Sequence, residues 1–308
     1  MKAIIYKSTG SWYLAKGADG QFYQSRARGV FKVDGITSTN PIAVGDEVEI
    51  VLEEGEERSA VITSIADRKN YVARVSPHNK HQHHIIASNL DQSLLLATLT
   101  TPKTSLGFID RFLVSSASFH IPAILVFNKS DLYRKKEMAL FDRYREIYTA
   151  AGYPVFLISV QDKTGLTPVK ELLTNHITLL SGHSGVGKSS FINALFPDFQ
   201  LRTSEVSEWS GKGLHTTTFA EMFDLPEGGS LIDTPGLREF GLVDISRQEL
   251  SHYFPEMLQL LPDCRYNDCM HINESDCAVK AGLAHGTVSE ERYISYRTIL
   301  DSLSEKSY

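Results

Sequence analysis

A run of residues near position 185 has the types and spacing of a phosphate-binding loop. In order, these residues are Gly182, His183, Ser184, Gly185, Val186, Gly187, Lys188, Ser189 and Ser190. The stretch 182–189 fits G-x-x-x-x-G-K-[ST], in which the backbone N–H groups of a glycine-rich turn surround phosphate oxygens. Lys188 would reach the β- and γ-phosphates of a nucleotide, and the Ser189 hydroxyl would bind Mg²⁺. A predicted strand over 177–180 and a predicted helix over 189–195 favour this interpretation over a simple tight turn.

A second motif indicates which nucleotide base is bound. Asn128, Lys129, Ser130 and Asp131 directly follow a predicted apolar strand over 121–127 and resemble the N-K-x-D guanine reader of GTPases. An ionised carboxylate only accepts hydrogen bonds, so Asp131 can pair with the guanine N1–H and exocyclic amine, a pattern that adenine lacks. We therefore expect GTP and GDP as ligands. The dipeptide at 159–160, after the next predicted strand, would be the loop that backs the base.

The third motif is Asp233, Thr234, Pro235 and Gly236, at the end of a predicted strand over 230–232. Asp233 would hold Mg²⁺ through water, and the Gly236 amide would meet the γ-phosphate. In common GTPases the phosphate loop comes first, whereas here the guanine reader precedes it. Because all these loops follow parallel strands, they converge at one sheet edge whatever their order along the chain. Domain termini are commonly close together, so the sequence predicts a circularly permuted GTPase domain.

All three cysteines and one histidine lie close together near the C-terminus. Cys264, Cys269, His271 and Cys277 form a C-x4-C-x-H-x5-C pattern. An odd number of cysteines argues against a disulfide framework, and three thiolates with one imidazole make a closed tetrahedral zinc site of the structural kind. The alternative is three reduced cysteines near a chance histidine.

These motifs must be positioned by elements that the hydrophobic pattern outlines. Short alternating segments, which we interpret as strands, are expected at 3–6, 11–16, 21–27, 46–52 and 58–65. Strands of this length and spacing predict a small antiparallel barrel over 1–70. The OB-fold fits its size best, and an SH3-like barrel is the alternative. Residues 71–90 are expected to be a basic linker, since no Asp or Glu occurs from Arg68 to Leu90. It would be either a phosphate-contacting arm or an ordinary solvated linker.

From residue 91 to 243 strands and helices alternate, as in a mainly parallel sheet covered on both faces. Further strands are expected at 93–99 and 154–159, and further helices at 108–119, 135–150 and 167–176. Residues 244–308 are predicted to be a helical zinc-binding domain. The fold class expected for the whole chain is therefore multidomain, with an OB-fold β-barrel, a permuted P-loop GTPase domain and a helical zinc domain.

Composition excludes several classes of protein. The 308 residues are 42% hydrophobic and 22% charged, which is typical of globular chains and excludes disordered and collagen-like ones. No apolar run approaches the ~20 residues of a membrane span, and no signal-peptide pattern opens the chain, so we expect a cytoplasmic protein. The net charge of −6 argues against coating nucleic acid by bulk electrostatics. Any contact with RNA must be local.

Across its full length the chain resembles the small ribosomal subunit biogenesis GTPases of the RsgA/YjeQ type. Residues 211–218 (GKGLHTTT) look like that family's switch I, and residues 89–92 (NLDQ) look like the start of its GTPase domain. Leu214 departs from the family, which often has arginine there. The resemblance implies GTP hydrolysis stimulated by the 30S subunit and a role in its late maturation. It also implies contact with 16S rRNA, one structural Zn²⁺ per chain and Mg²⁺ with GTP. We expect a monomer.

The residue after the third motif is Leu237, which cannot orient water as the glutamine of Ras-like enzymes does. His215 is the nearest candidate for that role, although it could instead be structural or contact RNA. Thr217 is the favoured Mg²⁺ ligand within 216–218. Two other functions remain open: a permuted GTPase of the large subunit, and an RNA-binding module whose nucleotide is only an occupancy switch.

Overall fold

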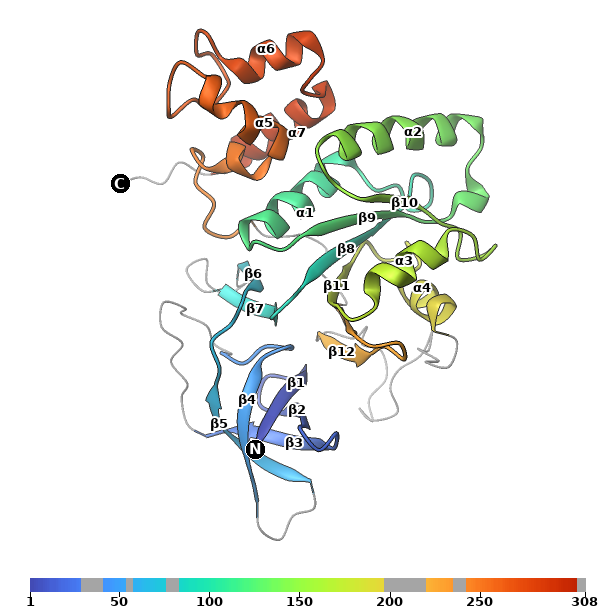
Figure 1. Ribbon diagram of the computed structural model, residues 1–308, viewed down its shortest axis with the longest axis vertical. Coiled ribbons are helices and arrows are strands. Elements are labelled where there is room, and N and C mark those ends of the chain that lie inside the picture. Colours follow the sequence, from blue (N-terminus) through green and yellow to red (C-terminus); the bar gives the residue numbers. More distant parts are fainter. Residues whose placement is uncertain (29–40, 54–57, 76–82, 197–219, 235–241, 304–308) are drawn as a thin grey trace.

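The protein is arranged as three parts in a row, as the computed structural model in Figure 1 shows. A small β-barrel contains the N-terminus, a layered α/β domain lies in the middle, and the short helices of the C-terminal region pack at the other end. The structure describes residues 1–308 except 29–40, 54–57, 76–82, 197–219, 235–241 and 304–308. No helix within the described ranges is long and apolar enough to cross a membrane.

Five short strands close into the N-terminal barrel. They are β1 (Lys2–Ser8), β2 (Tyr13–Gly17), β3 (Phe22–Ala27), β4 (Glu47–Leu52) and β5 (Ser59–Ile65). β1 pairs with β2 and β4, and β3 pairs with β2 and β5, so the ring of strand pairings closes through β4 and β5. Side chains alternate along β4: Val48 and Ile50 are buried, whereas Glu47 and Glu49 are exposed, as a strand period of two requires. The predicted five-stranded barrel is confirmed, but it is not wholly antiparallel, because β3 and β5 pair in parallel.

The middle domain is a mostly parallel sheet with helices on both faces. Its strands, in spatial order, are β10 (Val155–Leu157), β9 (Ala123–Phe127), β8 (Gln92–Ala97), β11 (Ile177–Ser181), β13 (Ser230–Asp233) and β12 (Glu221–Asp224). Only β12 runs antiparallel to its neighbour within this group. The helices are α1 (Leu106–Ser118), α2 (Lys135–Ala150), α3 (Leu166–Leu173) and α4 (Lys188–Leu195).

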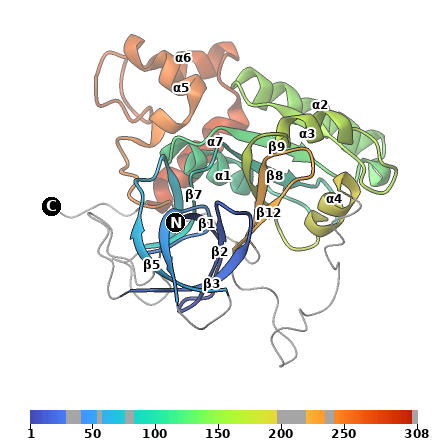
Figure 2. The same cartoon turned by 60° about the horizontal axis from the view of Figure 1, so that its bottom comes forward.

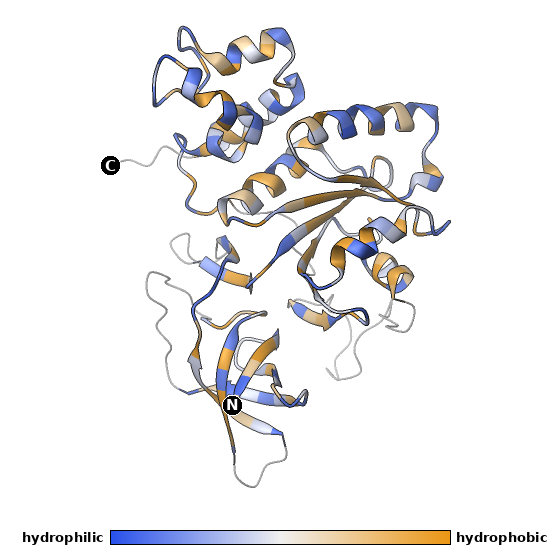
Figure 3. Ribbon diagram, viewed as in Figure 1, coloured by the Kyte–Doolittle hydropathy of each residue, from blue (hydrophilic) through white to orange (hydrophobic). Residues whose placement is uncertain are grey.

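Helices α1 and α2 cover one face of this sheet, and α3 and α4 cover the other. Every residue of β8 and β9 is buried, because strands covered on both faces need apolar side chains on both sides. Figure 3 shows these inner strands as mostly apolar, whereas much of α2 is hydrophilic. The predicted layered α/β domain is confirmed.

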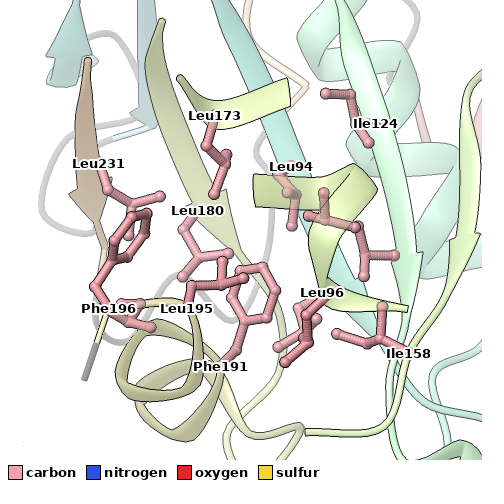
Figure 4. Packing of buried hydrophobic residues seen from close by; sticks show 14 of the residues in the cluster. Leu94, Leu96, Ile124, Ile158, Leu173, Leu180, Phe191, Leu195, Phe196 and Leu231 are labelled. Carbon is pink, nitrogen blue, oxygen red and sulfur yellow. The ribbon is translucent and has the colours of Figure 1, made fainter. Parts of the chain in front are cut away.

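An apolar cluster anchors the strand and the helix on either side of the phosphate-binding loop (Figure 4). Leu180 of β11 belongs to the same buried cluster as Phe191 and Leu195 of α4, and Leu94 and Leu96 of β8 extend it across the sheet. Burying one such side chain contributes about 1.5–3 kcal/mol. The two ends of the loop are therefore fixed by packing.

The barrel and the middle sheet are joined edge to edge. β1 of the barrel pairs antiparallel with β12, so a single hydrogen-bonded sheet of eleven strands runs through both parts. Figure 2 shows β12 between the barrel strands and the inner strands of the middle domain. Tyr6 and Lys16 of the barrel both donate hydrogen bonds to the Asp224 carboxylate, and Lys7 forms an ion pair with Glu221.

The segment 71–90, predicted as a basic linker, contains two paired strands, β6 (Tyr71–Val75) and β7 (His83–Ser88). Val72 and Ala87 are buried in one cluster with Val44 of the barrel side and Leu90. The linker prediction was wrong for these residues. It gave more weight to the histidines and to the absence of acidic residues than to the alternating apolar positions that mark strands. Arg68, expected in a phosphate-contacting arm, is instead only 8% exposed and forms an ion pair with the fully buried Asp46.

The C-terminal region is helical, as predicted. Its elements are the 3₁₀ helices η4 (Leu250–Tyr253) and η5 (Leu261–Asp263) and the helices α5 (Pro255–Leu260), α6 (Ala278–His285) and α7 (Glu290–Ser302). One apolar cluster contains Leu250, Phe254 and Tyr296 together with the three cysteines, and it includes Val114 of α1. This shared cluster packs the C-terminal region against the middle domain.

A buried ionic triad reinforces that contact. The Arg292 guanidinium of α7 donates from Nη1 to Asp110 Oδ1 of α1 at 2.6 Å, and from Nε to Glu256 Oε1 of α5 at 2.7 Å. It also lies 4.5 Å from the centre of the Phe254 ring. Burial alone would lower the pKa of Arg292, but the two carboxylates hold that pKa well above its ordinary value. The triad therefore holds a charged arginine at the contact between the two parts.

Candidate functional site

The loops that carry the sequence motifs follow the carboxyl ends of neighbouring parallel strands. The phosphate loop follows β11, the guanine-reader residues follow β9, and Asp233 ends β13. Residues 98–105 connect β8 to α1, and residues 158–165 connect β10 to α3. In open α/β sheets this edge is where ligands bind, and the permuted chain order does not change the convergence.

The phosphate loop approaches its neighbours closely. Gly182 has φ +149°, and a Cβ there would lie 2.4 Å from the Leu96 carbonyl oxygen. A Cβ on Gly187, at φ +99°, would lie 2.8 Å from Asn128 Nδ2. Only glycine adopts these positive φ angles readily and also leaves the Leu96 carbonyl and the Asn128 side chain in place. The chain therefore needs glycines here for packing, independently of any ligand.

Lys188 spans the phosphate loop from the start of α4. Its Nζ donates to the carbonyl oxygens of Gly182 at 2.7 Å and His183 at 3.3 Å. Burial lowers the pKa of Lys188, and the nearby Asp233 carboxylate opposes that effect. A cation held inside the loop in this way suits a polyphosphate ligand.

The guanine-reader residues are tied to the phosphate loop by hydrogen bonds. Asn128 Nδ2 donates to the Val186 carbonyl at 2.9 Å, and its Oδ1 accepts from the Val160 amide at 3.2 Å. Lys129 Nζ donates to the carbonyl oxygens of Thr101 at 2.6 Å and Gly185 at 2.7 Å. These contacts hold the two candidate ends of a nucleotide site, one for the base and one for the phosphates, in a fixed relation.

Ser159 has a specific structural partner that the sequence did not reveal. Its hydroxyl donates to Asp131 Oδ1 at 2.6 Å and accepts from the Asp162 amide at 3.0 Å, and Ser159 is completely buried. The hydroxyl thereby orients the carboxylate expected to read guanine. The sequence signal for this role was the position of Ser159 directly after β10. The base loop at 159–160 is shorter than in the family, so the role of Ser159 was not recognised.

Tyr133 is a second residue that sequence reasoning missed. Its hydroxyl donates to the Asn128 carbonyl at 2.7 Å and accepts from the Leu99 amide at 2.9 Å. It thus connects the guanine-reader loop to the loop after β8. No motif marks this position, because the contact depends on how two loops meet in space.

Asp233 has the environment expected of a group that binds a cation. Its Oδ1 is buried and has no hydrogen-bond partner among the residues that the structure describes. Burial raises the pKa of Asp233, the Lys188 ammonium lowers it, and the Glu221 carboxylate raises it. A buried carboxylate oxygen without a donor fits a role in holding hydrated Mg²⁺. His215, Thr217, Gly236 and Leu237 lie outside the described residues.

His183 of the phosphate loop stacks on α1. Its imidazole ring lies 3.8 Å, centre to centre, from the ring of Phe108, at an interplanar angle of 32°. Burial and the Lys188 charge lower the pKa of His183, so the ring is neutral near pH 7. The stack attaches the exposed turn of the loop to the helix that also carries Asp110.

The structure brings Cys264, Cys269, His271 and Cys277 together. All four are buried, and their ligand atoms lie within 4.8 Å of one another. His271 Nδ1 is 3.3 Å from Cys277 Sγ and 3.7 Å from Cys264 Sγ. Burial raises the pKa of the Cys269 thiol to about 12, so a thiolate there needs a cation. Three sulfurs and one nitrogen are a donor set that zinc prefers, and the cluster could hold that ion.

Residues of the surrounding loop and of α7 orient this candidate metal centre. Tyr293 donates to the His271 carbonyl at 2.7 Å, and Tyr296 donates to the Met270 carbonyl at 2.8 Å. The Glu274 carboxylate accepts from the Met270 and Ile272 amides. Such partners behind the ligands fix the geometry of a metal site, and the two tyrosines place that support on the helix that carries Arg292.

Comparisons with known proteins agree along the whole chain. The family described as RsgA GTPase matches residues 65–243, and the RsgA N-terminal domain matches residues 2–61. The curated protein "Small ribosomal subunit biogenesis GTPase RsgA 2" of Bacteroides thetaiotaomicron is 46% identical over 308 residues, which are 100% of this chain and 99% of that protein.

Solved structures show the same architecture. YjeQ from Thermotoga maritima has a TM-score of 0.78 and 31% identity, with 98% of both chains covered. YloQ, titled a circularly permuted GTPase, has a TM-score of 0.73 and 27% identity, with 98% of this chain and 94% of that chain covered. The permuted order of motifs in this chain is thus shared with a solved permuted GTPase.

Proposed function

This chain belongs to the RsgA family of GTPases, and we propose that it hydrolyses GTP during late maturation of the small ribosomal subunit. The observation that carries the proposal is the hydrogen-bonded link between the guanine reader and the phosphate loop, Asn128 to Val186 and Lys129 to Gly185. It supports a site in which Asp131 would recognise the base and the loop 182–189 would bind the phosphates. A site of this kind selects a guanine nucleotide and holds its phosphates in place.

Nucleotide binding follows from the chain's own groups. Asp131, oriented by Ser159, would accept two hydrogen bonds from guanine, while Lys188 and the loop amides would bind the phosphates. Ser189 and Thr217, with Asp233 through water, would hold Mg²⁺. When bound, Mg²⁺ would neutralise charge on the β- and γ-phosphates. The unpartnered Asp233 Oδ1 supports this assignment.

The slow step would be positioning of the attacking water. The Leu237 side chain has no polar atom with which to orient it, so turnover of the free protein should be slow, and His215 would position the water in the complex with the ribosomal subunit. His215→Ala should lower subunit-stimulated turnover at least about tenfold and change nucleotide affinity less than about twofold. If wild type and variant have equal stimulated turnover, another group, such as rRNA, must position the attacking water.

The proposed partner is the 30S subunit, through 16S rRNA. The net charge of −6 requires local cations on the binding surface. Arg68 and Lys69 are engaged in ion pairs with Asp46 and Asp91, so exposed arginines such as Arg28, Arg58 and Arg74 are better candidates for phosphate contacts. The protein would act as a monomer in the cytoplasm, with one Zn²⁺ held by the Cys₃His cluster.

The test is GTP hydrolysis by the purified protein alone, with 30S subunits and with 50S subunits. We expect slow hydrolysis alone, strong stimulation by 30S and little by 50S. Stimulation by 50S alone would contradict the proposal that 30S is the partner. Absence of hydrolysis in single-turnover assays with 30S would instead indicate a nucleotide-occupancy switch.

A further inference from the structure

One row of directly paired residues crosses the sheet from the phosphate-loop strand to the barrel. Leu180 of β11 pairs with Asp233 of β13, Asp233 pairs with Glu221 of β12, and Glu221 pairs with Lys7 of β1. Figure 2 shows β12 at this junction. Side chains directly opposite each other on antiparallel strands share one face, with Cβ atoms about 5 Å apart. Asp233, Glu221 and Lys7 are therefore consecutive neighbours on one face.

The charges along this row interact. Lys7 Nζ lies 2.9 Å from Glu221 Oε2, and the two side chains are 32% and 28% exposed. The Glu221 carboxylate also acts on Asp233: it raises the pKa of Asp233, after the larger effects of burial, Lys188 and the Thr234 backbone amide. Two negative groups are thus adjacent at the candidate Mg²⁺ site, with Lys188 beyond one of them and Lys7 beyond the other.

We propose that Lys7 of the barrel is a positioning residue for Mg²⁺–GTP, acting by neutralising Glu221 beside Asp233. This inference rests on the proposed function, because it needs Asp233 in the nucleotide site. The Mg²⁺–GTP complex carries net negative charge, and an uncompensated Glu221 would repel it at the γ-phosphate end. Barrel docking onto β12 should then strengthen Mg²⁺–GTP binding, and by linkage Mg²⁺–GTP binding should strengthen docking by the same factor.

The barrel offers a matched control at the other end of β12. Lys16 forms an ion pair with Asp224, which also accepts from Tyr6 and Ser230. Asp224 pairs in register with Ser230 and not with Asp233. Lys16→Met therefore removes a docking ion pair of the same kind without exposing a charge beside Asp233.

The experiment measures dissociation constants of the full-length protein for a non-hydrolysable GTP analogue with Mg²⁺ and for GDP with EDTA. Lys7→Met should weaken analogue binding about three- to tenfold, because the partly exposed Glu221 carboxylate is then left uncompensated beside Asp233. It should change GDP binding less than about twofold, because GDP lacks the phosphate nearest Asp233. The Lys7→Met/Glu221→Gln variant should recover analogue binding to within about twofold of wild type, and Lys16→Met should remain within that range.

Three results would overturn the inference alone: Lys7→Met binds the analogue like wild type, Lys16→Met weakens binding as much as Lys7→Met, or the double variant remains as weak as Lys7→Met. The last two would mean that barrel docking itself, and not the Glu221 charge, supports the site. If wild type fails to bind the analogue in the presence of Mg²⁺, the proposed function falls together with the inference.

Discussion

Replacement of Arg292 tests how the C-terminal region is held to the middle domain. Arg292 is 1% exposed and pairs with Asp110, which is equally buried, and with Glu256. Arg292→Met keeps much of the side-chain volume but removes the charge that compensates Asp110, which keeps neutral partners such as the Tyr148 hydroxyl at Oδ1. Removing one partner from a buried ion pair costs about 3–5 kcal/mol, because the remaining charge stays desolvated. The variant should lose about this much stability locally.

The assay is native-state hydrogen exchange of the α7 amides, which reports local opening without assuming that three parts unfold together. Asp110→Asn in the Arg292→Met background should restore about half of the loss, because no buried charge then remains at position 110. Glu256→Gln alone should cost only about 1–2 kcal/mol, since the Glu256 side chain is 11% exposed and the glutamine carbonyl oxygen still accepts one of the two hydrogen bonds from Arg292. A change below about 1 kcal/mol in Arg292→Met would refute the reasoning, as would a double variant less stable than the single one.

Two further predictions concern the base and the metal. Asp131→Asn should weaken binding of guanine nucleotides and favour xanthine nucleotides, because an amide replaces one acceptor by a donor; equal affinity of the wild type for ATP and GTP would contradict the assignment of the guanine reader. Cys277→Ser should reduce bound zinc from one ion per chain to less than about 0.2 by elemental analysis and lower the melting temperature of the C-terminal region; a wild type purified without metal yet fully folded there would refute the zinc site.

Local patterns predicted much of the fold. Helix α2 was expected at 135–150 and is found at Lys135–Ala150, because its polar residues and apolar stripe give a clear period. The barrel strands were also placed within a few residues, since alternation and glycine turns mark them. The four-residue strand β12 was missed, because such a short run carries little periodic signal and its strand partners are distant in sequence.

The contacts that support the site are long-range and could not be predicted. Asp110 and Arg292 are 182 positions apart, and Asn128 and Val186 are 58 apart. Motifs revealed Asn128 as a site residue but not its hydrogen bond to the phosphate loop. The segment that begins at Arg68 looked basic in the sequence for a related reason. The residue that neutralises Arg68 is Asp46, which lies 22 positions earlier, on the barrel side.

In the proposed function, a guanine nucleotide controls binding of the protein to the small ribosomal subunit. Co-sedimentation of the protein with purified 30S and 50S subunits, in GDP and in a non-hydrolysable GTP analogue, tests it most directly. We expect binding to 30S to be tighter in the analogue than in GDP and to weaken with rising salt, as phosphate contacts require. Equal 30S occupancy in both nucleotide states, or equal binding to 50S, would contradict it.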